Sequence, residues 1–190
     1  FATLETQVEA LKTRLETQGD KLLDTVLELE VLQVLIPPPG TSAEEHLQSA
    51  SVAEEIVAIA SANPEILSLQ SYAAKRLAEV GKLDEAKKLL EPVLSSETVS
   101  DLEKCRTEAS LFAAGGQYPD ASGKLLDFVT QNQESARQLC PIAAQYSIRA
   151  GQLDEAERAL LMIPETQRTP ATVHSLYQIA ESKDDDQGKR

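Results

Sequence analysis

Apolar residues in the first 36 positions recur at spacings that alternate between four and three, as the inner positions of a coiled coil do. Eight of the ten positions along this seam are apolar, and Gln18 and Thr25 are the polar ones. The spacing predicts a coiled-coil helix over residues 1–36. The positions predicted to mediate oligomerisation are Leu4, Val8, Leu11, Leu15, Leu22, Leu29, Leu32 and Ile36.

The apolar face of this predicted helix widens after Gly19, until it covers nearly the whole circumference between Leu22 and Ile36. A helix that is apolar on all sides needs more than one neighbour. Three prolines separate the helix from the next one, so we expect it to associate with another chain. Packing against its own repeat domain is the alternative. The polar seam positions Gln18 and Thr25 leave the oligomer number open.

Residues 37–42 begin with three prolines and a glycine, which end the helix because proline lacks an N–H donor and favours extended backbone. We interpret this segment as a short, stiff linker. Residues 43–182 are predicted to form a helical repeat domain, and residues 183–190 a charged, frayed tail. A truncation at Pro37 is expected to leave a folded helical monomer.

Beyond the linker, apolar residues follow a helical period and no stretch alternates as a strand does. Capping residues set the predicted boundaries: Ser42 or Thr41, Asn63 before a proline, and Ser100 with Glu103 as a capping box. The class is therefore predicted to be all-α. The expected helices cover about 43–61, 64–80, 83–95, 99–114, 118–131, 134–150, 153–163 and 170–182.

Small residues recur along the middle of the chain with a period of 35 residues. Such residues allow two antiparallel helices to approach closely, and a glycine after the first helix permits a left-handed helix end. The pattern predicts a short α-solenoid of about three helical hairpins, each covering an apolar face of the next. The recurring positions are Gly81, Gly116 and Gly151; Ala74, Ala109 and Ala144; Ala86, Ala121 and Ala156; and Leu90, Leu125 and Leu160.

This pattern resembles the tetratricopeptide repeat (TPR) family over about residues 64–164, with 35 residues per unit against the usual 34. The small residues, the turn glycine and the bulky leucine match the family. The aromatic residue early in the first helix and the tyrosine further along do not. Gln70, Cys105 and Cys140 replace the former, and Leu77, Phe112 and Ser147 the latter. Pentatricopeptide repeats, which bind RNA, also have 35-residue units and are an alternative.

The resemblance implies that the first helix of each hairpin lines a concave face. In the third hairpin the matching positions are Gln138, Pro141, Gln145, Ile148 and Arg149. We expect this groove to bind an extended or helical peptide that carries a carboxylate; ordinary solvated surface cations are the alternative. The pattern by which some relatives clamp a C-terminal carboxylate is not recognisable. The candidate partner-groove residues are Lys75, Arg106, Gln145 and Arg149.

The formal net charge of −13 argues against nucleic acid and against an anionic membrane surface, because both need a basic face. No transmembrane helix is expected, since the longest apolar run, Val31 to Ile36, is interrupted by Gln33. Residue 1 is phenylalanine, so we expect the chain to be a fragment or a processed product. A cytoplasmic location is favoured.

No catalytic, metal or cofactor pattern stands out. Cys105 and Cys140 occupy equivalent positions in neighbouring hairpins, too far apart for a disulfide, and are expected to be free and buried. His46 and His174 are isolated from any zinc-type spacing. The Asp-Glu pairs that begin at Asp84 and Asp154 complement helix dipoles.

We therefore expect a non-enzymatic scaffold that oligomerises through its N-terminal helix and binds a protein or peptide client through its repeats. The alternative is a structural subunit whose N-terminal helix docks into a larger multi-protein complex. No cofactor is expected.

Overall fold

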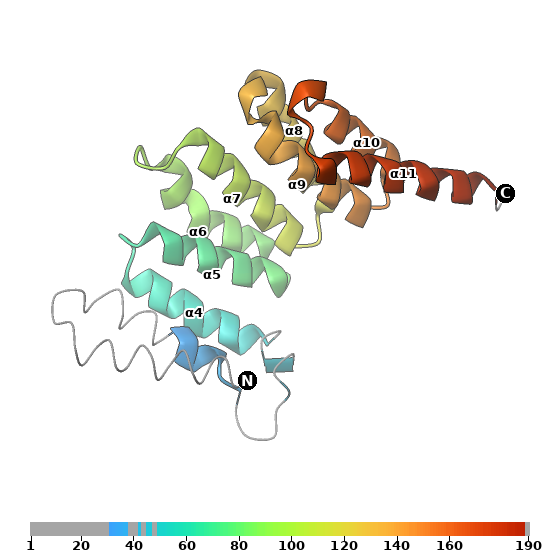
Figure 1. Ribbon diagram of the computed structural model, residues 1–190. Helices are drawn as coiled ribbons and strands as arrows, with labels where there is room; N and C mark the ends of the chain where they lie inside the picture. The colour runs from blue at the N-terminus through green and yellow to red at the C-terminus, as the bar shows by residue number, and fades with distance from the viewer. Residues whose placement is uncertain (1–30, 38–41, 43–44, 47–48, 189–190) are drawn as a thin grey trace, which may run out of the picture. The chain divides into compact units, whose positions relative to one another are not determined.

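The computed structural model describes residues 31–37, 42, 45–46 and 49–188 (Figure 1). Within these ranges the chain is helical and contains no strand, as the sequence predicts. The chain divides into two compact units, an N-terminal unit, Phe1–Ser95, and a C-terminal unit, Ser96–Arg190. The single repeat domain predicted over residues 43–182 spans the boundary between these units and stays a prediction.

The N-terminal unit contains a helical segment at residues 31–35, followed by α4 (Ala50–Ala62), α5 (Leu67–Glu79) and α6 (Leu83–Ser95). Each of these α-helices packs against the next, α4 against α5 and α5 against α6 (Figure 1). α6 contributes the buried residues Ala86, Leu90 and Val93, and one core cluster consists of apolar residues from α4 and α5. Its fully buried members include Val52, Ile56, Ala60 and Ala73.

The end of the predicted coiled-coil helix packs against this core. Val31, Val34 and Leu35 contact it, and His46 Nε2 lies 2.8 Å from the carbonyl oxygen of Val34. For this segment the structure therefore shows packing against the chain's own helices. Two of the predicted oligomerisation positions, Leu32 and Ile36, are half-buried. The others, Leu4, Val8, Leu11, Leu15, Leu22 and Leu29, lie outside the described residues.

Deleting residues 1–36 removes apolar cover from the α4–α5 core. Spacing along one helix does not reveal which surface that helix meets, so this contact was not foreseen, and whether truncation at Pro37 leaves a folded helical monomer stays a prediction. The division of the chain at Pro37 stays a prediction.

Two predicted helix starts differ from the structure. Ser42 Oγ accepts a hydrogen bond from the Glu45 N–H, as predicted, and residues 45–46 are helical, but α4 begins separately at Ala50, where Ser49 is the N-cap. The next helix, α5, begins at Leu67 rather than near residue 64. Asn63 does not start it. Its side-chain amide instead donates to the Ile59 carbonyl at 2.8 Å, which ends α4.

The C-terminal unit contains α7 (Asp101–Ala114), α8 (Tyr118–Gln131), α9 (Ala136–Arg149), α10 (Leu153–Leu161) and α11 (Pro170–Gly188). Short 3-10 turns cover Gln133–Ser135 and Glu165–Gln167. Consecutive helices pack against each other from α7 to α11 (Figure 1). The predicted capping box at the start of α7 is present, with Ser100 and Glu103 bonded reciprocally. Buried residues from all five of these helices contribute to one core cluster.

The three period-35 glycines have positive φ angles, +84° at Gly81, +75° at Gly116 and +73° at Gly151. Each closes the preceding helix with the same pair of hydrogen bonds. At Gly116 its own N–H donates to the Ala113 carbonyl, and the next N–H donates to the Phe112 carbonyl. These are the two bonds of a Schellman motif, which needs a left-handed residue at this point. The predicted role of the turn glycines is confirmed.

The period-35 alanines and leucines are buried, with at most 2% of any of them exposed. Their predicted core role is therefore confirmed on α5–α6, α7–α8 and α9–α10. The nine positions are Ala74, Ala86, Ala109, Ala121, Ala144, Ala156, Leu90, Leu125 and Leu160.

Polar residues at the positions that depart from the TPR pattern are buried and hydrogen-bonded. Gln70 Nε2 donates to the carbonyls of Ala60 at 2.6 Å and Asn63 at 3.2 Å, at the C-terminal end of α4. The hydroxyl of Ser147 lies 2.8 Å from that of Ser122, which also donates to the Ala143 carbonyl. Because these groups keep their partners, the positions tolerate polar side chains at low cost.

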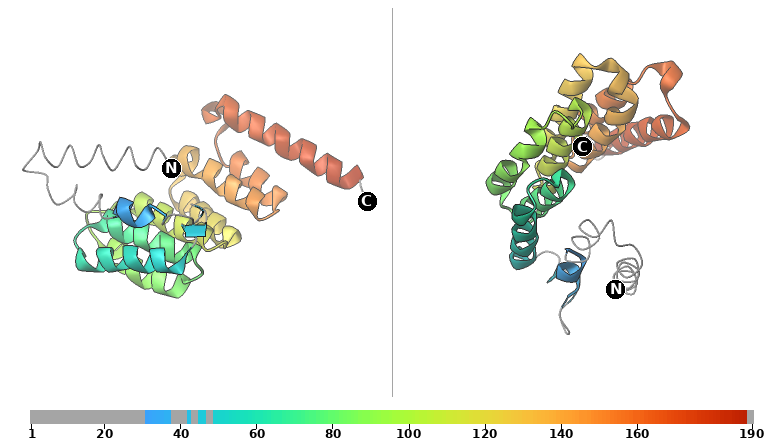
Figure 2. Two further views of the ribbon diagram at one scale, coloured as in Figure 1. Left: turned by 90° about the horizontal axis from the view of Figure 1, so that it is seen from below. Right: turned by 90° about the vertical axis from the view of Figure 1, so that its left-hand side faces the viewer.

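The predicted tail is partly helical. α11 continues to Gly188 as one helix instead of ending near residue 182 (Figure 2). Lys183 joins this helix to α10, since its Nζ lies 2.6 Å from Asp154 Oδ1 and 2.5 Å from Glu157 Oε2. The prediction that the chain frays from residue 183 onward is therefore wrong at Lys183, because long-range ion pairs hold this residue against α10.

A pair of glycine substitutions separates the energetic effect of backbone conformation from the effect of the space available to a side chain. A Cβ added at Gly116 or at Gly123 meets no atom within 4 Å, but only Gly116 has a positive φ. We expect Gly116→Ala to lower the free energy of unfolding by about 1 kcal/mol. Gly123→Ala should raise it by up to about 1 kcal/mol, because alanine favours the interior of a helix. Urea unfolding followed by circular dichroism measures both, and equal effects would contradict the assigned role of Gly116.

Candidate functional site

The four predicted groove residues are all exposed, but they belong to different units. Lys75 lies on α5 of the N-terminal unit. Arg106 on α7, together with Gln145 and Arg149 on α9, lies in the C-terminal unit. Arg106, Gln145 and Arg149 therefore share one unit, and Lys75 lies outside it.

Two arginines and two tyrosines gather on the C-terminal unit, and we call them the arginine–tyrosine cluster: Arg106, Tyr118, Tyr146 and Arg149. The guanidinium carbon of Arg149 lies 5.7 Å from the centroid of the Tyr118 ring. The Tyr118 and Tyr146 rings are tilted by 32° with centroids 6.4 Å apart. A cation over an aromatic face is held there electrostatically, so Tyr118 orients Arg149.

The second arginine joins this cluster through its charge. Burial raises the pKa of Tyr146, while the positive charges of Arg149 and Arg106 both oppose that rise. Both guanidinium groups are therefore close enough to act on the same hydroxyl. The cluster combines two cations, of which Arg149 is held over Tyr118, with a phenolic hydrogen-bond donor. These groups can bind an anion.

Neither Arg106 nor Arg149 forms an ion pair within the part of the chain that the structure describes. Hydrogen bonds from Ser100 are the main cause of the lowered pKa of Glu103, and the positive charge of Arg106 lowers this pKa further. Oε2 of Glu103 accepts hydrogen bonds from the Ser100 N–H at 3.2 Å and from the Ser100 hydroxyl at 2.9 Å. Other arginines, such as Arg158, do pair with glutamates. The two cluster arginines thus keep donors available to a ligand.

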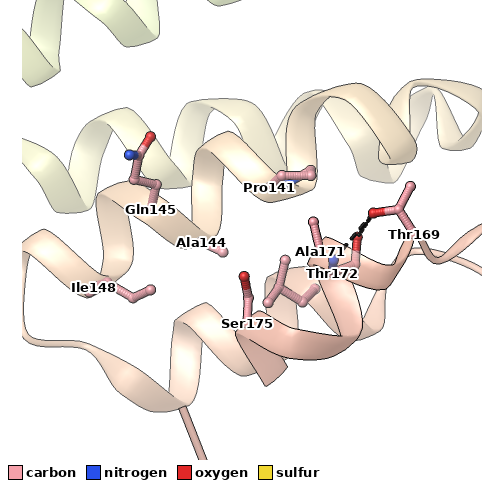
Figure 3. Close-up of a pocket in the computed structure, with 9 residues that line it drawn as sticks. Pro141, Ala144, Gln145, Ile148, Thr169, Ala171, Thr172 and Ser175 are labelled. Carbon is pink, nitrogen blue, oxygen red and sulfur yellow. Dashed lines mark hydrogen bonds between the residues drawn. The ribbon is translucent and has the colours of Figure 1, made fainter. Parts of the chain in front are cut away.

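A trough runs between α9 and α11 (Figure 3). It has two adjoining hollows of about 320 and 470 Å³, and both are lined by Ile148 and Ser175. Figure 3 shows side chains from α9 along one edge and from α11 along the other. We call it the α9–α11 trough. The first hollow is lined by Pro141, Ala144, Gln145, Ile148, Leu160, Thr169, Ala171, Thr172 and Ser175.

The polar groups of the trough differ in what they bind. Thr169 caps α11, accepting from the Thr172 N–H at 3.2 Å, and the two threonine hydroxyls lie 3.0 Å apart (Figure 3). The Gln145 amide and the Ser175 hydroxyl have no hydrogen-bond partner among the described residues. Ile148 is 45% exposed at the junction of the two hollows. An apolar surface with open polar groups beside it suits a peptide.

Sequence reasoning found Arg106, Gln145, Ile148 and Arg149 as groove positions, but it missed the two tyrosines and the trough. The tyrosines come from different helices, so their contact has no period in the sequence. The one sequence feature that could have drawn attention to them is their rarity, because the chain has only four tyrosines.

The cysteines are free and buried, as predicted. Burial raises the pKa of both thiols, and that of Cys140 to about 11. Cys105 Sγ lies 3.6 Å from the Lys124 carbonyl. Raised pKa values and apolar surroundings describe inert core thiols rather than reactive ones.

The described residues contain no group of three or more histidines, cysteines and carboxylates placed to hold a metal ion. In the same part of the chain, no helix combines the length and apolar character needed to cross a membrane.

Compared with protein-family models, curated proteins and solved structures, the chain gives no significant match. The resemblance to TPR units therefore stays a prediction.

The cysteines provide a test of the core. With a pKa of about 11, only about one in a thousand Cys140 thiols is ionised at pH 8. We expect iodoacetamide at that pH to alkylate both cysteines far more slowly in the folded protein than in 8 M urea, about 100-fold or more. Mass spectrometry of tryptic peptides measures each site. Rapid labelling of Cys140 in the folded chain would contradict its burial.

Proposed function

We propose that the C-terminal unit is a non-enzymatic peptide-binding module whose client carries a carboxylate. The observation that supports this most is the arginine–tyrosine cluster, in which Arg106 and Arg149 form no ion pair among the described residues of an acidic chain. Guanidinium groups bind carboxylates through paired, charge-assisted hydrogen bonds. The cation–π contact with Tyr118 fixes Arg149 in advance and so reduces the entropy lost on binding.

The net charge of −13 opposes an acidic client at long range. At physiological salt, however, charges are screened beyond about 8 Å. A carboxylate that reaches the cluster is then within range of two cations, while most of the acidic surface is screened from it. Binding therefore depends on local contacts rather than on long-range attraction.

The repeat architecture fits this role. We propose that α5–α6, α7–α8 and α9–α10 are TPR-like hairpins, supported by their shared glycine-closed turns and buried alanines. Such hairpins bury one face of the first helix and leave another free to vary. Self-association through residues 1–30 remains part of the proposal, since linked copies would raise the apparent affinity for a multivalent client.

Charge reversal tests the cluster. A phage library of random heptapeptides is selected on the full chain, and enriched peptides are then measured by fluorescence anisotropy. We expect them to be rich in aspartate and glutamate. Arg149→Glu should weaken their binding at least tenfold, because a charged hydrogen bond contributes about 1.5–3 kcal/mol.

Arg137→Glu is the matched control, since Arg137 is exposed on the same helix and changes the net charge equally. Binding should survive it. Equal affinities for the wild type and Arg149→Glu would eliminate the cluster as the binding site.

A further inference from the structure

The cluster and the α9–α11 trough lie on opposite flanks of one helix. Tyr146 on α9 faces the cluster contributed by α7 and α8, whereas Ile148 lines the trough shared with α11. Gln145 and Arg149 are one helical turn apart on the exposed surface between these flanks. A ligand that reaches both sites must therefore cross α9.

The two flanks have different chemistry. The cluster offers guanidinium groups and a phenol, which bind an anion. The trough is lined by two large aliphatic residues: Leu160 is buried, with 2% of its surface exposed, whereas Ile148 is 45% exposed. Covering Ile148 removes apolar surface from water, which favours an aliphatic side chain there. The hollow of about 320 Å³ is large enough to take one.

A ligand that crosses α9 from the trough passes Gln145 and Ser175, whose polar groups have no hydrogen-bond partner among the described residues. The Gln145 amide offers both a donor and an acceptor, and it lines the first hollow together with the Ser175 hydroxyl. An extended peptide backbone presents an N–H and a carbonyl at each residue. The Gln145 amide can therefore donate to a peptide carbonyl and accept from a peptide N–H. This arrangement favours an extended segment over a helix, whose backbone groups are already bonded internally.

We propose that the ligand is an extended peptide with two anchors, an acidic residue in the arginine–tyrosine cluster and an aliphatic residue in the α9–α11 trough. This inference rests on the proposed function and specifies its ligand. A helix with its side chains is about 10 Å across. An extended chain advances about 3.3 Å per residue, so the anchors should be about three residues apart.

The enriched heptapeptides test this spacing directly. We expect an acidic and an aliphatic residue about three positions apart, in one chain direction. Ile148→Asp should remove the aliphatic preference and weaken the wild-type peptides at least tenfold, while the acidic preference persists. Replacing the aliphatic residue of the peptide by alanine should weaken binding to the wild type but not further weaken binding to Ile148→Asp.

Val173→Asp is the matched control, because Val173 is 55% exposed on α11 and does not line the trough. It should leave binding unchanged. An aliphatic preference that survives Ile148→Asp, or the absence of a fixed spacing, would overturn the two-anchor proposal alone. Binding that is insensitive to Arg149→Glu would overturn the proposed function as well, and a library without any enriched peptide would contradict both.

Discussion

The close approach of the two helices in each hairpin is the constraint on which the rest of the structure depends. Alanines occupy equivalent positions on both helices, and all are nearly inaccessible to solvent, as at Ala144 on α9 and Ala156 on α10. At such positions a larger side chain has no space to occupy, since protein interiors are close-packed. The left-handed glycine that closes each first helix turns the chain tightly enough for the second helix to return alongside it.

This constraint separates packing residues from binding residues along a single helix. On α9, Cys140, Ala144 and Ser147 are buried, whereas Gln145 and Arg149 are exposed. The buried set can change chemically if its hydrogen bonds are satisfied, as glutamine at position 70 and cysteine at position 140 illustrate. The exposed set is free of packing demands, and the surface of each hairpin can therefore be adapted to a ligand without altering the fold.

Periodicity made the fold predictable, and contacts without a period were the ones missed. Helix ends set by glycine or by a capping box agreed with the structure, but Asn63 was misassigned, because asparagine can end one helix as readily as begin another. The role of Lys183 depended on Asp154 and Glu157, which are distant in sequence. The arginines of the site were predictable as exposed cations on helix faces. Their tyrosine partners were not, because that contact joins α8 to α9.

The most direct test of the alanine constraint compares two alanine-to-leucine substitutions in the C-terminal unit. Ala156 is fully buried on α10, and Ala180 is exposed on α11. Overpacking predicts that Ala156→Leu lowers the free energy of unfolding by about 1–3 kcal/mol. Ala180→Leu should change it by no more than about 0.5 kcal/mol. Urea unfolding gives both values, and an Ala156→Leu protein as stable as the wild type would contradict the claim that close helix approach holds this fold together.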